Sequence, residues 1–186
     1  LWVPPEKVLG GNLALNLTGV LGWKDVGANA TVGPFTGRIQ DDDWHFGDPV
    51  LGAALGWHEG KWHWSVGTLL NVPIGYWKQG DITNIGFNRW ALDVTGAVTW
   101  LDMARGIELS AAAGFTFNGE NSDTNYKTGT EFHLEAAAVQ NFSKSFGIGI
   151  NGYFYDQITG DSGAGASLGD FEGRVAAIGP VVNINF

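Results

Sequence analysis

Apolar and polar residues alternate along several stretches of the chain. This pattern predicts β-strands, because successive side chains of a strand point to opposite faces. Residues 62–76 show the alternation best, with small and polar side chains on one face. The other face carries Trp62, Trp64, Val66, Leu70, Val72, Ile74 and Tyr76. The segment is longer than the strands of about 5–6 residues usual in soluble proteins. A tilted strand that crosses an outer membrane has such an apolar band between aromatic girdles.

The same pattern recurs and predicts a single domain over residues 1–186. Its expected fold is all-β, an antiparallel up-and-down transmembrane β-barrel. We expect eight strands, at 11–23, 48–58, 62–76, 89–101, 106–118, 131–142, 145–157 and 173–186. A soluble β-sandwich also has strands with one apolar face. The strand lengths, the aromatic residues at strand ends and the inward faces rich in Gly, Ala, Ser, Thr and Asn favour the barrel.

The connections between these strands are short at one end of the barrel and long at the other. Tight turns are expected at 59–60, 102–105 and 143–144, and long polar connections at 24–47, 77–88, 119–130 and 158–172. Bacterial barrels have short turns on the periplasmic side and long loops outside. Acidic residues are concentrated in the long connections, so we expect an acidic outer rim that either gathers cations or is simply solvated.

Composition excludes several other classes of protein. Charged residues make up 16% of the chain, mean hydropathy is −0.02, and Cys is absent. No apolar run approaches the ~18 residues of a spanning helix, which excludes a helical membrane protein. A barrel remains compatible, because each of its strands has a polar face. The net charge of −9 argues against a nucleic-acid partner.

Two local motifs have a possible ligand-binding role. Gly147–Gly152 fits the spacing G-x-G-x-x-G, but it lies inside a strand pattern and does not open a helix, so we reject a dinucleotide site. Asp41–Asp43 are followed by Trp44 and His45 and could bind a hard cation through carboxylate oxygens. They lack a defined ligand spacing, and solvation is the better interpretation. We therefore predict no metal and no cofactor.

Catalysis at the barrel rim is a further alternative. His133 and Glu135 share one face of a strand, and Ser110 and Glu108 are expected on the adjacent strand. A hydrolase needs a nucleophile and a base of these types within reach of each other. Any polar lumen contains such groups, so we predict that the protein is not an enzyme.

Six segments occur in an order that resembles one family of bacterial channels. They are Gly47–Pro49, Pro73–Tyr76, Asn84–Trp90, Asn121–Glu131, Gly152–Gly163 and Arg174–Pro180. The order is similar to that in the outer-membrane channel family named for the meta-pathway of phenol degradation, and the resemblance covers nearly the whole chain. It implies a monomeric, twelve-stranded, porin-like channel in the outer membrane of Gram-negative bacteria. The resemblance also implies transport of small, often hydrophobic or aromatic, compounds.

The number of strands separates two interpretations, since eight are predicted and twelve are implied. In the first, the chain is a fragment that is incomplete at both ends. In the second, eight strands close by themselves, and side chains largely fill the interior. Val182–Phe186 resembles the C-terminal assembly signal of complete barrels and favours closure. We prefer the fragment, because the resemblance to the family ends in mid-protein.

The polar faces of the expected strands define a candidate pore lining. It comprises His63, Asn71, Asp93, Thr95, Glu108, Asn118, His133, Glu135, Asn151, Tyr153, Tyr155 and Arg174. Asp93, Glu108 and Glu135 are expected to form an acidic ladder opposite Arg174. We expect passive uptake of small molecules, with outer-membrane lipid and the permeant as partners. A structural envelope barrel with a filled lumen is the alternative from another class.

Overall fold

The computed structural model describes residues 1–184, apart from the side chains of residues 30 and 32. Eight strands form one antiparallel sheet in the order β1-β4-β5-β6-β7-β10-β11-β12, which confirms the predicted all-β antiparallel fold. Their bounds are β1 (Asn12–Thr18), β4 (Val50–Glu59), β5 (Trp62–Asn71), β6 (Ala91–Asp102), β7 (Ile107–Asn118), β10 (Glu131–Asn141), β11 (Phe146–Gln157) and β12 (Arg174–Ile184). In residues 1–184, no helix is long and apolar enough to cross a membrane.

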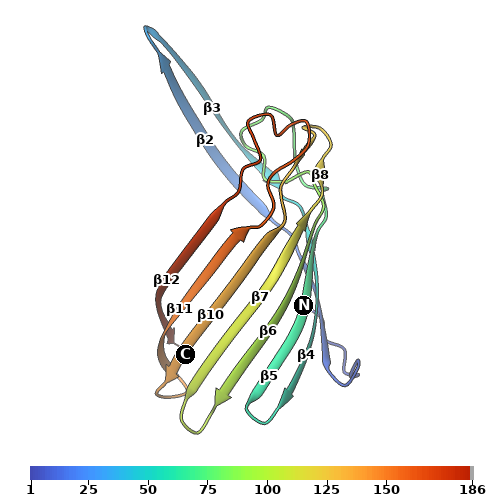
Figure 1. The fold of residues 1–186 in the computed structure, drawn as a ribbon, viewed down its shortest axis with the longest axis vertical. Helices are drawn as coiled ribbons and strands as arrows, with labels where there is room; N and C mark the ends of the chain where they lie inside the picture. The colour runs from blue at the N-terminus through green and yellow to red at the C-terminus, as the bar shows by residue number, and fades with distance from the viewer. Residues whose placement is uncertain (185–186) are drawn as a thin grey trace.

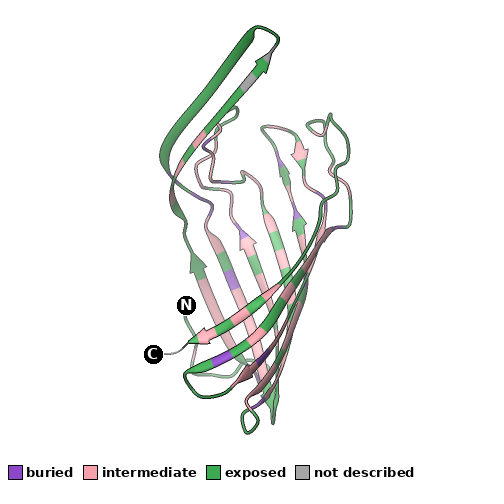
Figure 2. Ribbon diagram, turned by 90° about the vertical axis from the view of Figure 1, so that its left-hand side faces the viewer, coloured by how far each residue is buried: buried purple, intermediate pink, exposed green. Residues whose placement is uncertain are grey.

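The strands are tilted, and the sheet curls so that it has a concave and a convex side (Figure 1 and Figure 2). Tight turns join the strands at the lower end in Figure 1, and longer loops join them at the upper end. β1 and β12 are the two ends of the strand order, and within residues 1–184 they do not pair with each other. The described sheet is therefore an open, curled wall.

A long β-hairpin occupies the segment 24–47, where the sequence predicts a loop. β2 (Leu21–Val32) and β3 (Phe35–Phe46) form a separate two-stranded sheet that projects beyond the loops (Figure 1). Gly, Asn and Asp are depleted in strands, and their frequency here favoured the loop interpretation. Cross-strand pairs such as Trp23 with Trp44 stabilise the hairpin without a buried face.

Two predicted strands also end earlier than expected. The strand expected at 11–23 stops at Thr18, and residues 19–20, which are not in a strand, separate it from β2. The strand expected at 62–76 stops at Asn71, because Pro73 has no N–H to donate to a neighbouring strand. Residues 72–76 belong instead to the loop that precedes β6.

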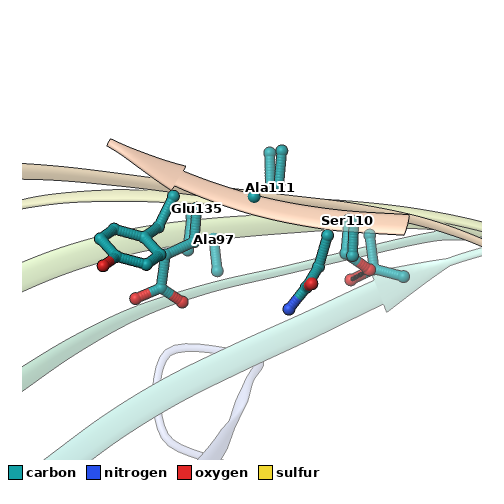
Figure 3. A pocket seen from close by; sticks show the side chains of 11 residues that line it. Ala97, Ser110, Ala111 and Glu135 are labelled. Carbon is teal, nitrogen blue, oxygen red and sulfur yellow. Dashed lines mark hydrogen bonds between the residues drawn. The ribbon is translucent and has the colours of Figure 1, made fainter. Parts of the chain in front are cut away.

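The register of paired strands divides the sheet into two faces, since directly opposed residues share a face. In Figure 3, Ala97, Ser110 and Glu135 point to one side of the sheet and Ala111 points to the other. We call the side of Ala97 the inner face, because the small and polar side chains of the sheet lie on it, Asp93, His133 and Glu135 among them. The opposite side, the outer face, is apolar and carries Leu13, Leu55, Val66, Val94, Phe115, Leu134, Ile150 and Ile178 among others.

Gly114 of β7 lies where side chains from β6 and β10 meet on the inner face. A Cβ at this position would lie 2.6 Å from Nε2 of His133 and 2.7 Å from the backbone oxygen of Val94. We expect Gly114→Ala to lower the free energy of unfolding by about 1–3 kcal/mol, as overpacking does elsewhere. Urea unfolding in detergent micelles measures this change. Gly96→Ala is the matched control, because a Cβ there meets nothing within 4 Å. Equal stabilities of the two variants would contradict the close packing.

Candidate functional site

Small side chains leave space along the middle of the inner face. One cavity of about 390 Å³ lies beside Ala97 and Tyr153, and a second of about 410 Å³ lies beside Gly67. Ala112 and Glu135 border both cavities. The second cavity is lined by residues from β1 through β10, so the space follows the concave side of the sheet across its strands.

A polar cluster crosses three strands next to the second cavity. The Asp93 carboxylate accepts hydrogen bonds from the hydroxyls of Thr95 (2.6 Å) and Thr116 (2.7 Å), and it contacts His133 Nε2 at 2.9 Å. His133 reaches from β10 across β7 to β6 because Gly114, which lies between them, has no side chain. The cluster therefore satisfies its own half-buried polar groups and forms a fixed part of the wall.

Glu135, Asn151 and Tyr153 differ from this cluster because none of their side chains hydrogen-bonds to another of the described residues. All three line the cavity of about 390 Å³, and Glu135 points into it in Figure 3. Their donor and acceptor groups are available to water or to a solute. This part of the wall can therefore interact with whatever occupies the cavity.

The predicted lining residues lie on the inner face, with Arg174 as the exception. Arg174 pairs in register with Asp156, which lies on the same side as Phe154 and Leu134. Its guanidinium forms two hydrogen bonds with the Asp156 carboxylate, at 2.9 and 3.0 Å, and its side chain is 71% exposed. The prediction for Arg174 is wrong because the residue lies at the loop end of β12, where a long side chain on the outer face can reach the interface.

The pairing of the strands does not bring Asp93, Glu108 and Glu135 together into the predicted acidic ladder. Asp93 opposes Thr116 near one end of β7, whereas Glu108 lies near the other end of that strand. Glu135 opposes Ala112, midway between these two positions. At about 3.4 Å per residue, neighbouring acidic side chains are on the order of 13 Å apart along the strands. The three carboxylates therefore act separately.

The groups considered for a hydrolase are not assembled into a catalytic site. The Ser110 hydroxyl contacts Thr99 at 2.9 Å and donates to Glu108 at 3.2 Å. His133 faces Asp93 and Thr95 through the same ring nitrogen, Nε2, so no relay from a nucleophile to a base and then to an acid is formed.

The loops at the upper end are held by a buried carboxylate. Asp48 Oδ1 accepts the Gly75 N–H at 2.8 Å, and its Oδ2 accepts the Phe87 N–H at 2.7 Å. The Asn71 amide donates to the same Oδ2 at 3.0 Å. Hydrogen bonds to a charged acceptor are stronger than neutral ones. Asp48 therefore fixes the loop 72–90 against the end of the sheet.

Further hydrogen bonds link the hairpin and three loops into one collar, made of β2, β3 and the loops 72–90, 119–130 and 158–173. They are Lys24 Nζ to the Asn84 oxygen (3.0 Å), Asn88 to Asn121 (3.1 Å) and the Gly129 N–H to Asp161 (3.1 Å). The two-residue strands β8 (Glu120–Asn121) and β9 (Tyr126–Lys127) pair within this collar. Several acidic residues of the predicted rim thus serve as acceptors inside the loops.

Asp81 gives the collar a dependence on pH. Hydrogen bonds from the hydroxyl and backbone N–H of Thr83, followed by that from Tyr76, lower the pKa of Asp81 to about 2. Because this pKa is lower in the folded protein than the ordinary value of 3.8, the ionised Asp81 stabilises the loop at pH values above 3.8. This stabilisation is lost as the pH falls toward 2 and the carboxylate is protonated. Hydrogen exchange of residues 72–90 should therefore rise between pH 4 and pH 2, relative to exchange in β6 and β7. In Asp81→Asn the relative rise in exchange of residues 72–90 between pH 4 and pH 2 should disappear. The same rise in the variant as in the original protein would contradict the role of Asp81.

The chain matches a known protein family over its whole length. The family model described as the MetA-pathway of phenol degradation matches residues 1–186. The chain belongs to this family. No curated protein matches it significantly. The family agrees with the one that the six sequence segments resemble.

A solved structure gives the fold of a similar protein. The crystal structure of an outer membrane channel from Pseudomonas putida F1 matches with a TM-score of 0.68 and 13% sequence identity. The match covers 95% of this chain and 73% of that chain. The sheet described above is therefore built like the wall of a channel barrel. The family and the fold point to an outer-membrane channel, which agrees with the predicted location and favours transport over catalysis.

The sequence places Ala112 and Gly114 among the small inward residues that leave room for a solute, and both lie on the inner face of β7. Thr116 and Glu131, which also lie on this face, were not predicted. The alternation of side chains along each strand could have found them, because Thr116 alternates with Phe115 and Phe117, and Glu131 shares the face of His133.

Proposed function

We propose that the chain forms the wall of an outer-membrane channel for passive uptake of small, hydrophobic or aromatic molecules. The observation that carries this proposal is the division of the sheet into an inner face of small and polar residues and a continuous apolar outer face. An apolar outer face suits contact with lipid, and an inner face of small and polar residues leaves a path for a solute. Volumes near 400 Å³ lie in the range of pockets that hold small molecules.

In this proposal the path is lined by the predicted inner-face residues. Selectivity then depends on the width of the path and on the donors, acceptors and charges along it. Asp93 and His133 are engaged with each other, whereas Glu135, Asn151 and Tyr153 are available to the solute. The collar of loops forms the outer entrance.

Uptake by intact cells tests the proposed function. Small apolar molecules cross phospholipid vesicles unaided, so the assay needs an outer membrane whose lipopolysaccharide leaflet slows them. Radiolabelled toluene and phenol should enter porin-deficient cells faster when the protein is expressed, and an uncoupler should leave entry into the periplasm unchanged. Uptake equal to that of cells without the protein would contradict the proposal and would favour a structural barrel with a filled lumen.

A further inference from the structure

The inner face carries charge of one sign. Its ionisable acidic side chains in the described sheet are Asp93, Glu108, Glu131 and Glu135, and no Lys or Arg occupies an inner-face position of these eight strands. His58, His63 and His133 are the only other groups there that can become positively charged. This part of the wall therefore favours neutral or cationic solutes over anions.

Glu135 is the carboxylate on this face that remains available. Asp93 is engaged by His133 and two hydroxyls, Glu131 accepts the Tyr155 hydroxyl at 2.8 Å, and Glu108 accepts the Ser110 hydroxyl. Within residues 1–184 the Glu135 side chain forms no hydrogen bond or ion pair. A carboxylate only accepts hydrogen bonds, so its natural complement is an O–H or N–H donor on a solute.

The surroundings of Glu135 complete a site with a defined chemistry. In register, Ala112 of β7 lies on one side of Glu135 and Tyr153 of β11 lies on the other. Tyr153 offers an aromatic ring to the cavity of about 390 Å³, and Ala97 and Ala112 leave the facing space free. A ring stacked on Tyr153 could therefore place an attached hydroxyl or amino group against the Glu135 carboxylate.

We infer that Glu135 and Tyr153 form a selection site for small, uncharged aromatic molecules that donate a hydrogen bond, such as phenols and anilines. Tyr153 contributes stacking, and Glu135 accepts the hydrogen bond from the solute. The same carboxylate repels aromatic carboxylates, because like charges in a narrow lumen are poorly screened. This inference rests on the proposed function and names the chemical class that the channel prefers.

Four labelled solutes of similar size separate the effects of the hydrogen-bond donor, the aromatic ring and the charge of the solute. They are phenol, toluene, cyclohexanol and benzoate. Toluene lacks the donor, cyclohexanol lacks the aromatic ring, and benzoate carries a negative charge. The full-length protein, expressed in porin-deficient cells, should admit phenol fastest and benzoate slowest. Glu135→Gln should raise the ratio of benzoate to phenol uptake about tenfold, since it removes the charge that repels benzoate and leaves phenol a weaker, neutral acceptor. Tyr153→Leu should lower the ratio of phenol to cyclohexanol uptake.

Glu59→Gln is the matched control, because it removes the same charge from a residue of β4 that opposes Trp62 on the outer face and does not line the path. It should leave the benzoate-to-phenol ratio within about twofold of the original. An equal change in both variants, or none in Glu135→Gln, would overturn the selection site while leaving the channel intact. Failure of the unmodified protein to admit any of the four solutes would overturn the proposed function itself.

Discussion

Ala112→Trp should reduce uptake of phenol and toluene to less than about a tenth of the original rate, since a bulky ring closes a path whose width sets its permeability. Ala112 borders both cavities and lies in register between Ala97 and Glu135. An indole at this position fills the space that the small side chains leave. The uptake assay in porin-deficient cells measures the effect, with the amount of folded protein in the outer membrane determined in parallel.

Ala111→Trp is the matched control for this variant. Ala111 is the preceding residue of the same strand, and in Figure 3 it points to the opposite side of the sheet from Ala97 and Glu135. A tryptophan there faces the apolar outer side and should leave uptake nearly unchanged. Equal inhibition by both variants would mean that the two faces have been assigned wrongly.

Asp48→Ala should release the loop 72–90 from the end of the sheet. The substitution removes the acceptors of the Gly75 and Phe87 N–H groups and of the Asn71 amide. Leaving such donors without partners should lower the free energy of unfolding by about 2–4 kcal/mol. Trypsin should then cleave after Lys78 in the folded variant, and urea unfolding in micelles should show the lower stability.

Asp48→Asn separates hydrogen bonding from charge. The amide keeps one acceptor oxygen, so we expect an intermediate stability and slower cleavage than in Asp48→Ala. A loop that stays resistant to trypsin in Asp48→Ala would contradict the role of this carboxylate.

The strands of the main sheet were predictable because each has one apolar and one polar face. The segment 106–118 illustrates this, since Leu109, Phe115 and Phe117 alternate with small or polar residues and β7 lies at Ile107–Asn118. The hairpin of β2 and β3 could not be predicted in this way. It has no buried face, and cross-strand pairing rather than burial stabilises it.

The sequence predicted which residues lie on the inner face better than it predicted which of their side chains contact each other. The alternation of side chains along each strand places Asp93 and His133 on one face. Their contact also depends on the register of three strands and on the space left by Gly114, which the alternation does not give. Arg174 was predicted to line the pore because it is charged, although the alternation of side chains along its strand indicates the other face. The apolar residues of β12, Ala176 and Ile178, share its parity and indicate the outer face.

Conductance of the purified full-length protein in a planar lipid bilayer tests most directly whether the inner face lines an open path. An open path predicts discrete conductance steps, which Ala112→Trp suppresses and Ala111→Trp preserves. A bilayer that stays silent after insertion of folded protein would contradict it.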